Sequence, residues 1–273
     1  MSAPKAPDGD VLLDVAGVKL RLGGNQILDG VSFQILDRVR QGEITGQVVA
    51  LLGPSGIGKT RLFRIIAGLD APHGGKVRGA GGANLPAGSV GVVFQDYPLL
   101  KHRTVIDNLV TAGVVAGMRA SDARTRGKDL LATFKLSDHA DFYPSQLSGG
   151  QRQRVAIAQQ IVRPRRLLLM DEPFSGLDPA ALEDVTKLIV DVANLDELNS
   201  ILLVTHDIRA AMIVGDTMHF LGRDRRDGKV VPGAKIQGTI DLVERGLAWT
   251  RGVAELPEFS ILEREIKARF TTL

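Results

Sequence analysis

Residues 53–60 read GPSGIGKT, which fits the spacing G-x-x-x-x-G-K-[ST]. An apolar run precedes this segment and a helical pattern follows it, the context in which such glycines bind phosphates through successive backbone N–H groups. The lysine would contact the β- and γ-phosphates, and the threonine hydroxyl would ligate Mg²⁺. A glycine turn without a function does not account for the lysine and threonine in register. The predicted phosphate-binding residues are Gly53, Pro54, Ser55, Gly56, Ile57, Gly58, Lys59 and Thr60.

Two acids end the apolar run RLLLMDE, residues 166–172. Carboxylates at the carboxyl end of a parallel strand lie at the ligand-binding edge of the sheet. We therefore expect Asp171 to hold Mg²⁺ and Glu172 to polarise an attacking water. Taken alone, the two acids are equally consistent with an N-cap for the next helix; the glycine-rich segment upstream favours the catalytic interpretation.

Gln95, in VVFQD, and His206, in ILLVTHD, also follow apolar runs. Each alone is a weak signal, because a polar strand end or a lone histidine is more often structural than catalytic. Both are predicted to lie on the side of the sheet where the glycine-rich segment and Asp171 converge.

The stretch YPSQLSGGQRQRVAIAQQ, residues 143–160, places a Ser-Gly-Gly turn directly before a helical pattern. Bare amides at a helix start are suited to an anion, and glycine permits a close approach of the backbone. The simpler interpretation is a plain turn with Ser148 as the N-cap residue.

These residues need a framework of buried strands and covering helices. Val/Leu/Ile-rich runs without alternation predict parallel strands covered on both faces, as in an α/β fold. The predicted strands are 47–53, 89–95, 166–173 and 200–207, and the predicted helices are 59–68, 152–162, 180–194 and 207–214.

Other segments give different patterns. The opening stretch from Val11 alternates and predicts antiparallel strands, whereas residues 95–163 are mainly helical without a convincing strand. A turn or hairpin and a terminal amphipathic helix are expected beyond Gly222. We interpret the glycine-rich residues 73–88 as a surface loop, and the basic stretches 163–166 and 222–229 as solvated loops.

Composition excludes several classes of protein. The 273 residues contain no cysteine, so neither disulfides nor thiolate metal sites can form. No apolar run approaches the ~18 residues of a membrane-spanning helix, and the N-terminus lacks the apolar region of a secretory signal. The formal charge of +3 and the 4% aromatic content disfavour single-stranded nucleic acid as a partner. We expect a cytoplasmic protein.

The ordered motifs resemble the ATP-binding cassette (ABC) ATPases from about Val11 to Gly222. The motifs are GPSGIGKT, Gln95, LSGGQ (147–151), LLLMDEP, SGLD (175–178) and His206. The pentapeptide LSGGQ between the glycine-rich segment and DEP distinguishes this family from kinases, GTPases and helicases. The resemblance implies an α/β P-loop NTPase (RecA-like) core with a parallel sheet, an N-terminal antiparallel β-subdomain and an inserted α-helical subdomain.

The resemblance also implies a division of the chain. Residues 1–10 would be a disordered leader, and residues 11–222 the ATPase domain. Within that domain, residues 11–94 and 164–222 would form the core and residues 95–163 the helical subdomain. Residues 223–273 would be a C-terminal hairpin and helix.

The resemblance assigns roles to single residues. Glu172 would be the general base, His206 would contact the γ-phosphate, and Gln95 would contact Mg²⁺ or the attacking water and relay nucleotide state to a partner. The metal ligands would be Thr60, Gln95 and Asp171. In this family two cassettes dimerise head to tail, so the signature residues Ser148, Gly149, Gly150 and Gln151 would contact ATP held by the other subunit. Asp178 would lie on a loop at the dimer interface.

Three features depart from the family pattern. Leu22 stands where an aromatic residue usually stacks on adenine, which predicts weaker or less base-selective binding. Arg61 replaces a common hydroxyl residue; by the resemblance it would still bind ATP, because its backbone amide could contact the α-phosphate, but the hydroxyl contact is lost. The segment 36–46 is longer than usual, which we interpret as a surface hairpin. These departures leave a degenerate, catalytically poor cassette as an alternative. The residues that argue against it are the intact Lys59, Asp171, Glu172 and His206.

One cassette without a membrane segment predicts a peripheral subunit on the cytoplasmic face of the inner membrane. Its expected partners are permease subunits, a second cassette and a solute-binding protein, and no nucleic acid. QDYPLLKHRTVIDNL (95–109) resembles importer cassettes, and residues 255–270 resemble nitrate/sulfonate/taurine-type importer ATPases. The alternatives are a lipid- or lipoprotein-handling ABC system and a non-transport ABC ATPase of DNA repair or translation. The repair proteins insert a long coiled coil for which residues 95–147 leave no room, and the translation factors carry two cassettes.

Overall fold

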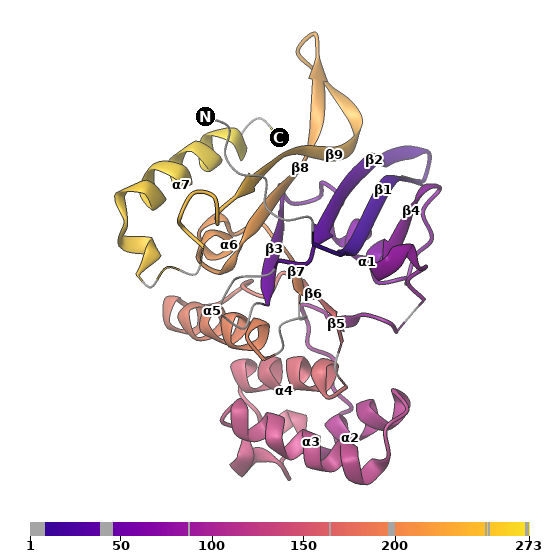
Figure 1. Ribbon diagram of the computed structural model, residues 1–273, viewed down its shortest axis with the longest axis vertical. Helices are drawn as coiled ribbons and strands as arrows, with labels where there is room; N and C mark the ends of the chain where they lie inside the picture. Colours follow the sequence, from indigo (N-terminus) through magenta and orange to yellow (C-terminus); the bar gives the residue numbers. More distant parts are fainter. Residues whose placement is uncertain are drawn as a thin grey trace.

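The computed structural model describes residues 9–38, 46–86, 88–163, 165–195, 200–248, 250, 252–270 and 273. Most of the predicted leader 1–10 and most of the predicted hairpin 36–46 therefore lie outside the described residues. The described strands form one sheet with the order β4-β1-β2-β9-β8-β3-β7-β6-β5 (Figure 1). Among the described residues, no helix is both long and apolar enough to cross a bilayer.

The parallel half of the sheet positions the candidate site. It consists of β3 (Gln47–Leu52), β5 (Gly91–Val93), β6 (Leu167–Asp171), β7 (Ser200–Thr205) and the start of β8 (Thr217–Arg226). Every residue of β3, β6 and β7 is buried. Along β3, Val48, Ala50 and Leu52 join one hydrophobic cluster, whereas Val49 and Leu51 join another. Both faces are thus covered, which explains the unbroken apolar runs.

The antiparallel half begins with β1 (Val11–Leu22) and β2 (Asn25–Leu36), as predicted. The interpretation of residues 73–88 as a loop is wrong in part, because β4 (Gly74–Gly79) pairs with β1. Gly75 has φ +80°, and a Cβ there would lie 2.3 Å from the carbonyl carbon of Gly17. Glycine is required by this close approach of two backbones, so the strand is rich in glycine, which is usually depleted in strands.

The predicted hairpin is longer than expected. β8 pairs antiparallel with β9 (Lys229–Asp241), and the strands join through Asp227 and Gly228, whose φ values are +50° and +75°. Asp-Gly is a preferred dipeptide for such a tight turn. The interpretation of residues 222–229 as a solvated loop is therefore wrong, since Gly222–Arg226 belongs to β8. Figure 1 shows the hairpin tip projecting from the sheet.

Helices cover the parallel strands and form a separate group. α1 (Lys59–Ile66), α5 (Pro179–Ala193), α6 (Ile208–Val214) and α7 (Pro257–Phe270) accompany the sheet. α2 (Val105–Val115), α3 (Ala120–Thr133) and α4 (Gly149–Ile161) lie together at the far end of the molecule from the β8–β9 hairpin (Figure 1). The described residues between Gln95 and Arg163 contain helices and no strand, as the sequence pattern predicts.

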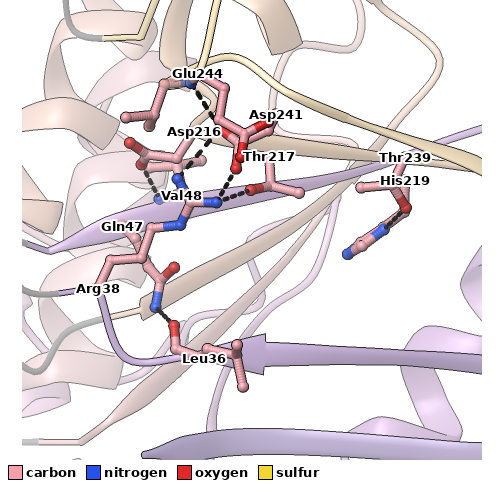
Figure 2. A network of polar contacts seen from close by, with 11 residues as sticks. Leu36, Arg38, Gln47, Val48, Asp216, Thr217, His219, Thr239, Asp241 and Glu244 are labelled. Carbon is pink, nitrogen blue, oxygen red and sulfur yellow. Dashed lines mark hydrogen bonds and ion pairs between the residues drawn. The ribbon is translucent and has the colours of Figure 1, made fainter. Parts of the chain in front are cut away.

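A polar network fastens the end of β2 to the strands beside it (Figure 2). Arg38 donates hydrogen bonds to the carboxylate of Asp241, at 3.3 Å for one of them, and to Thr217 Oγ1 at 3.2 Å. Burial lowers the pKa of Arg38, but the neighbouring carboxylates raise it by more. Asp216 is fully buried and accepts a hydrogen bond from the Val48 amide at 2.8 Å. These contacts join the end of β2 and the start of β3 to β8 and β9, which come much later in the sequence.

Candidate nucleotide-binding and catalytic site

Residues 53–58 form a loop that begins where β3 ends, and Lys59 and Thr60 open α1. Two of its glycines permit close packing. A Cβ on Gly53 would lie 2.6 Å from the carbonyl oxygen of Leu221, and Gly58 has φ +112° with Ile27 and Leu28 3.1 Å from a Cβ placed there. The loop can adopt this path only with glycine at these positions.

Lys59 is buried inside this loop. Its Nζ donates hydrogen bonds to the carbonyl oxygens of Gly53 at 2.7 Å and Pro54 at 3.2 Å, and lies 3.5 Å from Glu172 Oε1. Burial lowers the pKa of Lys59, and the nearby carboxylate of Glu172 opposes that shift. The loop therefore holds a cation at its centre, where the sequence predicts phosphate.

Glu172 is the next residue after β6. Its Oε2 lies 2.9 Å from Nδ1 of His206 and accepts a hydrogen bond from the His206 amide at 3.3 Å. The Glu172 amide donates to the carbonyl oxygen of Val204 at 2.8 Å, which ties it to the end of β7. The structure thus brings together Lys59, Glu172 and His206, three residues predicted separately from the sequence.

Asp171 lies beside this group at the end of β6. It is 7% exposed, and its Oδ1 is buried without a hydrogen-bond partner. Burial raises the pKa of Asp171 and the carboxylate of Glu172 raises it further, whereas a hydrogen bond from Thr60 and the charge of Lys59 lower it. An orphaned buried carboxylate oxygen is a position that a cation would satisfy.

Gln95 and Asp171 line the same open cavity. The amide of Gln95 donates to Ser175 Oγ at 3.2 Å, which leaves its carbonyl oxygen available. Thr60, Gln95 and Asp171 together offer hydroxyl, amide and carboxylate oxygens, the ligand atoms that Mg²⁺ prefers. The residues present therefore fit this ion.

The Ser-Gly-Gly turn opens α4, and Ser148 is its N-cap, as the simpler interpretation predicts. Ser148 Oγ accepts from the Gln151 amide at 3.3 Å, while Gln151 Oε1 accepts from the Ser148 amide at 2.8 Å. This reciprocal capping box satisfies two free amides. A Cβ added to Gly149 or Gly150 would meet no atom within 4 Å. The chain itself gives no packing reason for these two glycines.

The remaining predicted residues lie around this core. Ser55 and Gly56 are exposed at the loop tip, and Ile57 is buried. Arg61 is exposed and pairs with Asp70 at 3.7 Å, so its side chain turns toward the end of α1.

Two further predicted positions, Asp178 and Leu22, have exposed side chains. Asp178 caps α5, because its Oδ1 accepts from the amides of Ala180 at 3.0 Å and Ala181 at 2.9 Å. The side chain is exposed, so capping leaves one edge of the carboxylate open to solvent. Leu22 is 39% exposed at the end of β1.

Sequence reasoning missed two residues that reach the candidate catalytic edge. Tyr97 donates its hydroxyl to the carbonyl oxygen of Pro173 at 3.3 Å, and Gln153 donates to the same oxygen at 3.1 Å. Gln153 is 1% exposed, although it is polar and lies in α4. The helical region therefore contacts the residue that follows Glu172 at one shared acceptor. A polar residue on the buried face of α4 was the only signal in the sequence.

Comparisons with known proteins agree with this geometry. The sequence profile described as ABC transporter matches residues 37–175. The sulfate/thiosulfate import ATP-binding protein CysA of Bordetella bronchiseptica is 41% identical over 222 residues, which are 78% of this chain and 60% of that protein. The L-cystine import ATP-binding protein TcyC of Bacillus subtilis is 37% identical over 234 residues, 81% of this chain and 88% of that protein. The chain thus spans about 60% of the length of the CysA relatives.

Two solved structures share the fold. CbiO1 from Clostridium perfringens, described as part of the ABC transporter complex cbiONQ, has a TM-score of 0.71 at 25% identity, with 87% of this chain and 91% of that chain covered. The dimeric, post-hydrolysis structure of the ATP-binding cassette MJ0796 with ADP and Pi has a TM-score of 0.65 at 26% identity, with 85% and 99% covered. The predicted P-loop fold is confirmed. The chain belongs to the ABC transporter family.

Proposed function

We propose that this chain binds and hydrolyses ATP and that hydrolysis drives the import of a small solute by an ABC transporter. The observation that carries the proposal is the contact of both Lys59 and His206 with the carboxylate of Glu172. These three groups meet at the edge of the sheet where the glycine-rich loop begins. A phosphate-binding cation, a base and a residue that orients the base are the parts that ATP hydrolysis requires.

The glycine-rich loop would hold the phosphates. Its backbone amides and the N-terminus of α1 favour negative charge, and Thr60 and Arg61 follow in the first turn. On binding, Lys59 would exchange the carbonyl oxygens of Gly53 and Pro54 for phosphate oxygens. Leu22 offers apolar contact in place of an aromatic ring for the base.

Thr60, Gln95 and Asp171 would hold Mg²⁺ beside the phosphates. The ion, when bound, neutralises charge on the phosphate oxygens. Its approach would also satisfy Asp171 Oδ1, which has no partner among the described residues.

Glu172 would act as the general base. Its carboxylate accepts a proton from the attacking water while His206 holds it in place through Nδ1 and the backbone amide. Gln95 would contact the water or the metal. The intact set of residues speaks against a degenerate cassette.

A second cassette would complete the site. We infer that Ser148, Gly149, Gly150 and Gln151 contact ATP held by a partner subunit, since their open glycines have no packing role in this chain. Asp178 would lie at the same interface. The structure of MJ0796, described as dimeric, supports this arrangement by analogy.

The chain would act with other subunits at the membrane. We propose permease subunits as partners, with residues 95–163 as the helical subdomain that receives them, and a solute-binding protein that selects the cargo. The location would be the cytoplasmic face of the inner membrane. Relatives named for sulfate/thiosulfate and L-cystine import support a small solute, and residues 255–270 suggest kinship with nitrate/sulfonate/taurine-type importers.

A tagged pull-down from gently solubilised native membranes tests the transport assignment, and phosphate release by the purified chain tests hydrolysis. We expect a polytopic permease together with a solute-binding protein, whose ligand then identifies the cargo. Recovery of the chain alone, or with ribosomes or DNA, would overturn the transport assignment while leaving the ATPase assignment to its own assay.

A further inference from the structure

A second cavity lies at the edge of the sheet opposite the candidate catalytic site. Its volume is about 410 Å³, and its lining includes Leu12 at the start of β1, Gly79 at the end of β4 and Leu167 at the start of β6. Asp171 of the catalytic group is the last residue of β6, whereas Leu167 is the first. At a rise of ~3.3 Å per residue in a parallel strand, the Cα atoms of these two residues are about 13 Å apart. The two sites therefore share a strand but no residue.

Three arginines, Arg163, Arg165 and Arg166, line this cavity, and no described aspartate or glutamate does. Arg165 donates to the carbonyl oxygens of Gln160 at 3.2 Å and Val90 at 3.3 Å, so backbone groups hold it in place. Burial lowers the pKa of Arg165, and the like charge of Arg163 lowers it further. The cluster thus carries positive charge that no lining carboxylate neutralises.

Arg166 is the arginine most available to a ligand. It is exposed, and its guanidinium forms no hydrogen bond or ion pair within the described part of the chain. Asp10 lines an adjacent cavity to which Arg166 also contributes. No ion pair joins these two side chains, so the charge of Arg166 remains available to the larger cavity.

The rest of the lining is mainly apolar. Leu12, Leu85, Pro86, Val90 and Leu167 form the walls, and Asn84 and Ser89 add polar groups. Small-molecule sites are typically cavities of roughly 300–1,000 Å³ with apolar walls and few polar anchors. An inorganic anion would match the arginines but would leave these walls uncovered.

We propose that this cavity binds a small organic anion whose sulfonate, phosphate or carboxylate head faces the arginine cluster and whose apolar body covers the leucine, proline and valine walls. The charge-assisted hydrogen bonds of guanidinium groups suit all three heads. The proposal is independent of the proposed function, since it rests on residues that take no part in ATP binding.

Titration of the 273-residue chain, saturated with ADP to occupy the glycine-rich loop, tests the site. The probes are benzenesulfonate, phenyl phosphate and benzoate, which share a ring and differ in the head. Inorganic phosphate is an anion without an apolar ring, and benzylamine has the ring but carries a positive charge. We expect at least one of the three ring anions to cause saturable shifts of the Asn84 and Ser89 amide resonances. The anion that binds most tightly identifies the preferred head group. Phosphate and benzylamine should bind more weakly.

Arg166→Gln tests the charge, with Arg126→Gln as the control because Arg126 is an exposed arginine on α3 without a described partner. We expect dissociation constants about tenfold higher for Arg166→Gln, the size of one lost charged hydrogen bond, and unchanged for Arg126→Gln. Equal thermal unfolding of both variants checks the fold. Equal affinity of the two variants, equal binding of benzylamine, or shifts confined to residues 53–60 would overturn the proposal.

Discussion

The ammonium group of Lys59 and the carboxylate of Glu172 form an ion pair at 3.5 Å, and both side chains are largely buried. Glu172 therefore lies between a cation in the glycine-rich loop and His206 at the end of β7. Phosphate oxygens entering the loop would compete with Glu172 for the ammonium group. In the proposed function, ATP binding then changes the partner of the base as well as filling the loop.

Glu172→Gln should retain ATP binding and slow hydrolysis by at least ~10²–10⁴-fold, the contribution of a general base. The amide keeps the shape of the side chain but cannot accept a proton from water. Phosphate release and the fluorescence of a mant-labelled ATP measure the two effects. Glu183→Gln, an exposed substitution on α5, serves as the control. Near-normal turnover of Glu172→Gln would refute the assignment.

Gly149→Ala should separate folding from function. The position is helical and a Cβ there meets no atom within 4 Å, so alanine should raise the free energy of unfolding by about 0.4–1 kcal/mol. If a phosphate held by a partner subunit must approach this amide, the same methyl group should reduce ATPase activity by about tenfold or more. Urea unfolding and phosphate release measure the two quantities. Unchanged activity would show that no phosphate approaches Gly149.

Tyr97 and Gln153 should be energetically coupled because both donate to the carbonyl oxygen of Pro173. Burial raises the pKa of Tyr97 to about 12, so its hydroxyl remains a donor at neutral pH. Tyr97→Phe or Gln153→Leu alone should each cost about 1 kcal/mol of unfolding free energy, while the double variant leaves the acceptor unsatisfied and should cost more than the sum. A double-mutant cycle by urea unfolding measures the coupling. Strict additivity would contradict a shared acceptor.

His219 should make the fold sensitive to acid. Burial lowers the pKa of His219 to about 4, from an ordinary value of 6.5. Between these values the unfolded chain binds more protons than the folded chain, so the free energy of unfolding should fall as pH decreases, by roughly 3 kcal/mol in total.

Urea unfolding of His219→Gln between pH 7 and pH 4 isolates this contribution, because the variant should lack that part of the slope. His102→Gln, an exposed histidine substitution, should keep the slope of the unmodified chain. Parallel pH profiles for His219→Gln and the unmodified chain would show that the buried imidazole does not cause it.

The sequence predicted the parallel strands because β3, β6 and β7 are buried on both faces and so appear as unbroken apolar runs. It did not reveal β4, where glycine is required by the approach of Gly75 to Gly17. The outer part of β8 was also missed, because its arginines are partly or fully exposed on a hairpin that extends beyond the core.

The sequence predicted those residues of the candidate site that belong to a motif of fixed spacing, such as Lys59 in the glycine-rich motif. It did not predict residues whose side chains bind a backbone carbonyl, as those of Tyr97 and Gln153 do, since such a contact leaves no pattern in the sequence. Asp178 illustrates a third case, in which one residue type suits both a helix cap and an interface.

The backbone of Glu172 has φ +48°, a left-handed conformation between Asp171 and Pro173. A residue with a Cβ costs about 1–2 kcal/mol there relative to glycine. The hydrogen bonds of its amide to Val204 and of its carbonyl oxygen with the Ser175 amide hold the strained conformation. Glycine at position 172 would relieve this strain, but it would leave the buried ammonium group of Lys59 without its carboxylate partner, a loss of about 3–5 kcal/mol. A laboratory selection for heat resistance alone would therefore keep a carboxylate at position 172, and with it the proposed base.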